Sequence, residues 1–250
     1  MANETFNTFG RSTVADQATF DAGLRAHMVR VYNYMASGLA LSGIVALALF
    51  SSSELAGIFF QVSPRGHVVG LNILGWVAIL APIGLLLLTS FRGAQMSVMS
   101  IQAVYWTVTA LMGVSLSLLL FRYTGASVAR TFFVTAAAFG ALSLYGYTTK
   151  RDLSAWGKFL FMGLVGLMIA SLVNVFFPSG TMSFIISVVG VLIFSALIAY
   201  DTQSIKEQYS EALSAGDLEK VAVFGALSLY LDFVNPVSYT HLTLPTIYSV

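Results

Sequence analysis

Apolar runs of about twenty residues recur along this chain of 250 residues, and short polar breaks separate them. A run of that length crosses a bilayer as a helix, because lipid offers no partner to an unpaired backbone group. The predicted spans are 31–50, 68–90, 99–121, 129–147, 156–177 and 182–201, and a seventh apolar stretch starts near Val221. The sequence therefore predicts an all-α fold, a polytopic membrane bundle of seven transmembrane helices.

The composition excludes several classes of protein. Hydrophobic residues make up 57% of the chain and charged residues only 9%, too few to cover a soluble domain. The net charge of +1 leaves no basic stripe for nucleic acid. The absence of cysteine excludes disulfides, thiol nucleophiles and thiolate metal sites. His27, His67 and His241 lie in separate segments without ligand spacing, so neither a zinc site nor a cofactor is predicted.

Lysine and arginine residues predict the orientation of the bundle. With the N-terminus inside the cell, nine of them fall in inside segments: Arg11, Arg25, Arg30, Arg92, Lys150, Arg151, Lys158, Lys206 and Lys220. Only Arg65, Arg122 and Arg130 fall outside. Because cytoplasmic loops carry the excess of positive charge, residues 1–30 are predicted to form a cytoplasmic N-terminal segment ahead of a membrane domain at 31–235. Residues 1–30 lack the apolar run and cleavage site of a signal peptide.

The informative residues of a membrane protein are those that lipid rejects, and two aspartates stand out. A charged side chain at the centre of a bilayer costs about 2.5 to 3.5 kcal/mol on insertion scales. Asp201 ends the sixth span and can also be explained as an acid at the cytoplasmic interface. Asp232 interrupts the seventh apolar stretch about 17 Å beyond its start, which favours a functional role. Asn235 lies three residues later and projects from the same helix face.

The two aspartates can share a proton if their carboxyl groups lie close together. Both cannot carry a charge cheaply in a low-dielectric site, so the pair is expected to hold a proton near neutral pH and release it as the pH rises. Arg92, after the second span, would favour the charged form and latch helix two to helix six, or it is a snorkelling interface anchor. Depth is a difficulty, because Asp232 lies about 10 Å deeper than Asp201. The gap closes if the seventh helix starts in the cytoplasm, capped by Asp217.

Two membrane acids are also typical of intramembrane aspartyl proteases. The second aspartate of those enzymes lies in a Gly-x-Gly-Asp motif, which is missing around Asp232. No Gly-rich loop is followed by Lys-Ser or Lys-Thr, so there is no P-loop. We therefore predict that the protein is not an enzyme. Asn174 either supports helix packing or lines a pathway.

Three stretches carry a family resemblance. They are TGASVARTFFVTAAAFGALSLYGYTTKRDLS at 124–154, AYDTQ at 199–203 and ALSLYLDFVN at 226–235. With these motifs the chain resembles the transmembrane Bax inhibitor motif family, in its bacterial YccA-like branch, from about Phe20 to Asn235. The resemblance implies six or seven helices, with the last one central to the bundle.

The resemblance also implies a function. Similar bacterial members include pH-sensitive calcium leak channels of the inner membrane; their paired aspartates fall on Asp201 and Asp232, and the arginine that latches the closed state falls on Arg92. Calcium would then be the transported ion, held transiently by the aspartates, with Asn235 and Asn174 as candidates for the pathway lining. Lipid, calcium ions and protons would be the partners. The alternative is a non-conducting regulator that binds a membrane protease or another integral partner.

The C-terminal tail departs from the family pattern. Members continue after the last motif with an apolar run and a basic end, whereas residues 236–250 read PVSYTHLTLPTIYSV. Pro236 and Pro245 are helix breakers, so the seventh helix is expected to be truncated near Asn235. We expect 236–250 to be foreign sequence, such as translated vector read-through. Sequencing the native reading frame tests this, and an uninterrupted frame through Val250 would contradict it.

Overall fold

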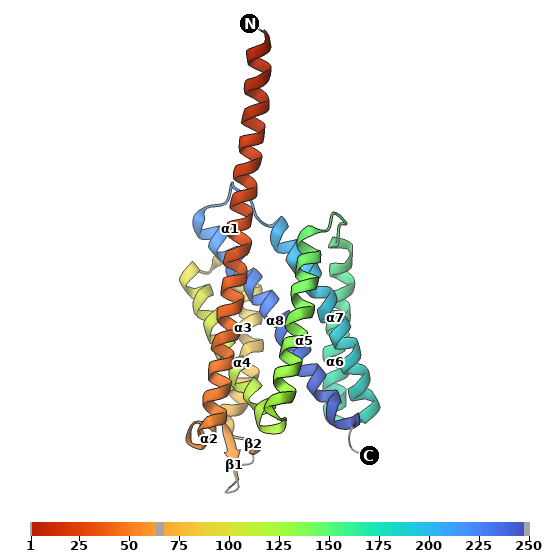
Figure 1. Ribbon diagram of the computed structural model, residues 1–250. Coiled ribbons are helices and arrows are strands. Elements are labelled where there is room, and N and C mark those ends of the chain that lie inside the picture. The colour runs from red at the N-terminus through yellow and green to blue at the C-terminus, as the bar shows by residue number, and fades with distance from the viewer. Residues whose placement is uncertain (1, 64–67, 248–250) are drawn as a thin grey trace.

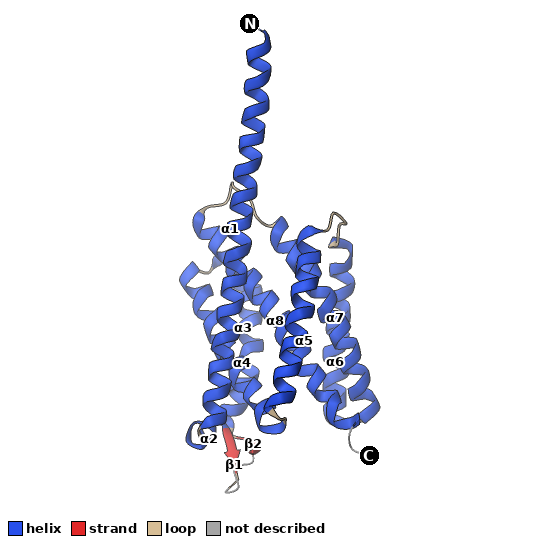
Figure 2. Cartoon of the chain, viewed as in Figure 1, coloured by secondary structure: helices blue, strands red, loops and turns tan. Residues whose placement is uncertain are grey.

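The computed structural model describes residues 2–63 and 68–247, and for residues 2–17, 94, 175 and 239–247 it describes the backbone alone. Arg65 and His67 therefore lie outside the described residues, as do the side chains of Arg11 and His241. The described part forms helices almost throughout (Figures 1 and 2). The helices are α1 (Ala2–Ser51), α2 (Ser53–Phe59), α3 (Ile73–Arg92), α4 (Val98–Arg122), α5 (Gly125–Thr148), α6 (Ser154–Phe176), α7 (Gly180–Glu207) and α8 (Ala215–Ile247), with a 3-10 turn at Gly93–Gln95.

Seven helices of the described part are long and apolar enough to cross a membrane, which confirms the predicted fold class. They run alternately up and down the bundle, joined by short connections (Figure 1). A polar side chain caps the start of several of them. Asn72 accepts a hydrogen bond from the Gly75 amide at 2.9 Å, and Ser97, Thr124 and Ser179 cap α4, α5 and α7. These caps satisfy backbone donors that have no partner within the helix.

The bundle has two ends, which we name by what they carry. The basic end comprises the start of the α1 span, the end of α3, and the α5–α6 and α7–α8 connections (Figure 1). It carries Arg25, Arg30, Arg92, Lys150, Arg151, Lys158, Lys206 and Lys220. The opposite end, the hairpin end, carries Arg122 and Arg130 at the α4–α5 connection. The cations predicted to share one side thus lie at one end, and the cytoplasmic location of that end stays a prediction.

The connection before α3 differs from the all-α prediction. Strand β1 (Phe60–Val62) pairs antiparallel with β2 (Val68–Leu71), and Phe60 lies opposite Leu71. The predicted second span therefore starts at Ile73 and not at residue 68. A turn sequence with proline and glycine between two valine-containing runs favours a hairpin. The apolar character of 68–72 favours a membrane span instead, and the structure shows the hairpin.

Helix α8 is the centre of the bundle, as predicted for the last helix. Of the 18 most apolar consecutive residues of its span, 67% are buried, against 11% for the corresponding 18 residues of α6. It crosses the bundle obliquely and packs against α1, α4, α5 and α7 (Figure 1). Its core residues include Ala222, Ala226, Tyr230 and Phe233, all at most 3% exposed.

The predicted truncation of this helix is wrong, because α8 continues through Pro236 and Pro245 to Ile247. A proline removes one helical hydrogen bond and clashes with the preceding turn, which bends a helix without necessarily ending it. At membrane depth a continued helix also leaves fewer backbone groups unpaired than an irregular chain would. The expectation that 236–250 is foreign sequence stays a prediction.

Candidate functional site

Two carboxyl groups meet inside the bundle, one from α7 and one from α8. Asp201 lies near the end of α7, Asp232 lies past the middle of α8, and their side chains are hydrogen-bonded to each other. A hydrogen bond between two carboxyl groups requires a proton on one of them, because a carboxylate can only accept. The structure therefore brings together the two acids that the sequence singled out, in an arrangement that one shared proton would satisfy.

Burial makes Asp232 the more demanding of the two acids. Its side chain is 4% exposed, and its Oδ2 atom has no hydrogen-bond partner among the described residues. Asp201 is partly buried. An ionised carboxylate in such surroundings is costly unless it is paired or hydrogen-bonded. The site therefore favours a proton or a cation beside Asp232.

The course of α8 explains how two acids at different predicted depths reach each other. The helix starts at the basic end, before its apolar stretch, where Ser214 accepts a hydrogen bond from the Asp217 amide at 3.1 Å. The Ser214 hydroxyl also donates to the Asp217 carboxylate at 2.7 Å, so both residues build the cap. From there α8 slants across the bundle (Figure 1), so each of its residues descends less along the bundle axis than in an upright helix.

Arg92 does not reach the carboxyl pair. It is exposed at the end of α3, and the described residues provide no hydrogen bond or ion pair for it. The next residue, Gly93, lies against the ring of Phe224 on α8. Phe224 precedes Asp232 by eight residues, about 12 Å along the helix. The predicted latch would therefore require α3 and α8 to shift relative to each other, and it stays a prediction about another state.

The two asparagines serve local structure here. Asn235 donates from Nδ2 to the carbonyl of Leu231 at 2.8 Å, one turn back on its own helix. Asn174 donates to the Ser183 hydroxyl at 2.9 Å and accepts from the Ser179 amide at 3.1 Å, and so joins α6 to the start of α7. These bonds favour the packing role for Asn174, while a pathway role for either residue stays a prediction.

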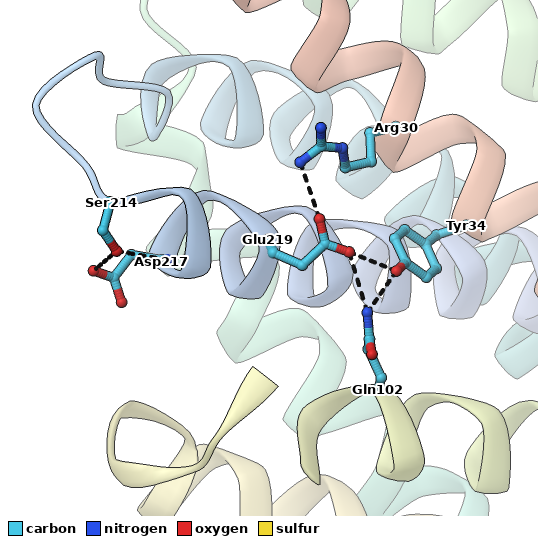
Figure 3. A network of polar contacts seen from close by, with 6 residues as sticks. All are labelled: Arg30, Tyr34, Gln102, Ser214, Asp217 and Glu219. Atoms are coloured by element: carbon cyan, nitrogen blue, oxygen red, sulfur yellow. Dashed lines mark hydrogen bonds and ion pairs between the residues drawn. The ribbon is translucent and has the colours of Figure 1, made fainter. Parts of the chain in front are cut away.

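A polar cluster that the sequence did not single out joins three helices at the basic end (Figure 3). Glu219 of α8 accepts a hydrogen bond from Arg30 of α1 at 2.9 Å through Oε2. Its Oε1 accepts from the Tyr34 hydroxyl at 2.5 Å and from Gln102 of α4 at 3.2 Å. Gln102 also donates to the Tyr34 hydroxyl at 2.7 Å. We call Arg30, Tyr34, Gln102 and Glu219 the Glu219 clasp.

The sequence did contain a signal for the clasp. Glu219 precedes Ala222, Val223 and Ala226 by three, four and seven residues, and all three are at most 1% exposed. Residues at that spacing share one face of a helix, so an acid on it needs a partner. The partners themselves come from α1 and α4, distant in the chain, and only the fold identifies them.

Further polar links hold α8 and α7 deeper in the bundle. The hydroxyl groups of Ser42 and Tyr230 are 2.6 Å apart, and Ser42 donates to the carbonyl of Thr109 at 2.7 Å, which ties α1, α4 and α8 together. A second chain runs from α1 through α5 to α7. The Tyr32 and Ser143 hydroxyls are 2.7 Å apart, and Ser143 lies 3.1 Å from the Thr202 hydroxyl, beside Asp201. Thr202 and Tyr230 lie one and two residues from Asp201 and Asp232 in the sequence, so these chains fix the helices that carry the carboxyl pair.

We expect Glu219→Gln to destabilise the bundle by about 1 kcal/mol, because it removes a charge from a pair whose arginine is half exposed and screened. For a chain of this size the melting temperature should fall by about 2–4 °C. Tryptophan fluorescence during heating in detergent measures it. Lys220→Gln is the matched control, since its contact with Asp217 is an i,i+3 pair within α8 and joins no second helix. Equal shifts for both variants would contradict a role for the clasp.

The described residues offer limited capacity for a bound metal. They contain no group of three or more His, Cys, Asp or Glu side chains that could hold an ion. Calcium takes six to eight oxygen ligands in stable protein sites. Two carboxyl groups can therefore contribute ligands to a passing hydrated cation, whereas a resident ion would need more oxygens than these.

Comparison with known proteins places the chain in a family. The family model described as inhibitor of apoptosis-promoting Bax1 matches residues 24–237. A protein of Caulobacter vibrioides is 47% identical over 238 residues, covering 93% of this chain and 94% of the relative. A protein of Rickettsia prowazekii is 42% identical over 91% of this chain and 92% of the relative. The inner membrane protein YbhL of Escherichia coli is 39% identical over 86% and 88%. The chain belongs to the Bax inhibitor family of membrane proteins, in its bacterial branch.

Proposed function

We propose that the protein is a pH-sensitive calcium leak channel of a bacterial inner membrane, controlled by the Asp201–Asp232 pair. The observation that carries this proposal is a hydrogen-bonded pair of carboxyl groups between two spanning helices, with a buried Asp232 oxygen to which no N–H or hydroxyl of the described residues donates. Intramembrane acids face bundle interiors and mark ion or proton pathways. Membership in the family and the inner-membrane relative from Escherichia coli support the location.

Proton control follows from the chemistry of the pair. At low pH one proton joins the carboxyl groups, and no nearby cation is required. When that proton leaves, two negative charges remain in a low-dielectric site, which is costly unless a positive group approaches. Arg92 is the cation at the end of α3, and its approach to the charged pair would latch α3 to the centre of the bundle. Flux should therefore be higher at low pH, with the latch open, than at high pH.

Calcium is the ion that the family resemblance implies, and the ligands available suit it. Carboxylate and backbone carbonyl oxygens are the ligands that calcium prefers. Pro236 lies four residues after Asp232 and has no N–H, so it cannot donate the usual helical hydrogen bond to the Asp232 carbonyl oxygen. Conduction requires binding weak enough for the ion to leave. A pair of acids completed by water is suited to a leak and not to storage.

We expect calcium flux into dye-loaded proteoliposomes to be greater at about pH 6 than at about pH 8, because one proton per pair separates the two states. A version with a family-like C-terminus in place of 236–250 runs in parallel, so that an unsuitable tail cannot imitate inactivity. Arg92→Gln should raise flux at the higher pH towards its low-pH value, since the charged pair loses its latch.

Silence from a folded, tail-restored protein at both pH values would contradict the channel. It would leave the non-conducting regulator, whose function would reside in surfaces exposed to a membrane protease or another integral partner. Flux that is equal at both pH values would contradict proton control and retain conduction.

A further inference from the structure

A groove runs between α1 and α5 at the basic end of the bundle. It encloses a cavity of about 620 Å³, lined by Met28, Val29 and Tyr32 of α1 and by Phe139, Gly140 and Leu144 of α5. Its rim is apolar and exposed: Val29 is 49% exposed and Leu144 is 63% exposed. Exposed apolar side chains on a membrane-spanning bundle face hydrocarbon. The groove therefore opens sideways into the bilayer.

The groove is as deep as one leaflet. Its inner end is Phe139, an aromatic step backed by Phe233 of α8 at 5.8 Å between ring centroids. Tyr147 lines the groove near the basic end, eight residues from Phe139 and thus about 12 Å away along α5. Half of a bilayer core is about 15 Å. Between these limits the slot is open, because a Cβ atom added to Gly140 would meet nothing within 4 Å.

Positive charge stands at the mouth of this apolar slot. Arg25 lines the cavity and is exposed, and no carboxylate of the described residues forms an ion pair with it. Lys206 lies beside Tyr147, donating to its carbonyl oxygen at 2.9 Å with Nζ 5.7 Å from the ring centroid. Asp21 lies one turn farther out on α1 than Arg25. Cations at the interface attract anionic lipid headgroups, and arginine binds phosphate through several N–H groups.

We propose that the groove between α1 and α5 binds one anionic phospholipid, with its phosphate at Arg25 and an acyl chain in the slot above the aromatic step. The charge of the mouth matches the headgroup, and the length and apolar lining match the chain. The proposal concerns binding and holds whether or not the protein conducts ions. Its wall also contains Tyr32 and Ser143, which hydrogen-bond on to Thr202, so a bound lipid would contact the chain that links α1, α5 and α7.

Native mass spectrometry of the purified full chain tests the proposal. After delipidation, the protein is titrated with palmitoyl-oleoyl phosphatidylglycerol or with the matching phosphatidylcholine. We expect one tightly held phosphatidylglycerol per chain. Gly140→Leu should fill the slot and reduce that binding by about tenfold, as loss of the apolar contact of a few methylene groups would. Gly166→Leu is the matched control, because Gly166 is an exposed glycine of α6 with equally open space around its Cβ position.

The headgroup is tested separately. Arg25→Gln should reduce the preference for phosphatidylglycerol by about fivefold, the contribution of one basic residue at a membrane surface, while Arg25→Lys keeps it. Arg130→Gln at the hairpin end is the control. Undiminished lipid binding by Gly140→Leu, or equal binding of both lipids unaffected by Arg25→Gln, would overturn the proposal. A dimer that Gly140→Leu converts to monomer would also overturn it, because a second copy would then occupy the groove.

Discussion

Replacing Asp232 by asparagine should abolish the pH dependence of calcium flux while leaving α7 and α8 joined. The asparagine amide can donate to the Asp201 carboxylate, so the hydrogen bond survives without a shared proton. One proton can change an equilibrium by up to about tenfold per pH unit, and that dependence disappears with the titrating pair. The ratio of flux at low and high pH in proteoliposomes should therefore approach one.

Asp152→Asn is the control for this experiment. Asp152 lies in the exposed α5–α6 connection, where hydrogen bonds from Ser154 hold the pKa of its carboxyl below the ordinary value. It is therefore ionised throughout the pH range used, and its loss should not alter the ratio. Asp201→Asn should behave like Asp232→Asn, because either change removes the shared proton. A pH ratio that survives in both variants would assign the sensing to other groups.

Gly146→Leu should prevent the bundle from assembling. Gly146 of α5 faces the backbone of Ala199 on α7, and a Cβ atom at this position would collide with the Ala199 carbonyl. Spanning helices use glycine for such close approach, because packing replaces the hydrophobic drive that lipid removes. Overpacking costs about 1–3 kcal/mol in cores that can adjust, and a collision with backbone leaves less room to adjust. Size-exclusion chromatography in detergent should show loss of the monodisperse protein.

Gly140→Leu is the matched control for that prediction. It introduces the same side chain on the same helix, 6 residues away, where nothing lies within 4 Å of the added Cβ. It should elute like the unchanged protein. If Gly146→Leu were equally monodisperse, α5 and α7 would not pack as closely as described, and the position of Asp201 would have to be revised.

The spans and the acids could be predicted from the sequence because both are expressed locally. About twenty consecutive apolar residues predict a membrane-spanning helix without reference to the rest of the chain. Asp232 can be recognised as a candidate site residue because an acid in a membrane span is costly wherever the helix packs. Whether Asp201 reaches Asp232 was not decided locally, because it depends on the slant of α8 and on the Ser214 cap.

The Glu219 clasp, the continued α8 and the hairpin before α3 could not be predicted from the sequence. They depend on residues distant in the chain or on a balance between two opposing local preferences. Glu219 lies on a buried helix face, but Arg30, Tyr34 and Gln102 come from other helices. Proline rules treat Pro236 as a helix breaker, whereas its lost hydrogen bond and its clash with the preceding turn can be met by a bend in a continued helix. Hydropathy alone does not reveal the hairpin before α3, because the valines of β2 are as apolar as the start of a membrane span.

The central position of α8 has a consequence for how the protein is made. A chain emerges from the ribosome in order, so the helix at the centre of the bundle is synthesised after the six other spans. Until it arrives, three polar side chains of the earlier spans lack their hydrogen-bond partners on α8: Ser42, Gln102 and Asp201. The pairs α1–α4, α3–α4, α5–α7 and α6–α7 can pack before it arrives, so the last helix to be made is the one that joins two preassembled groups of spans.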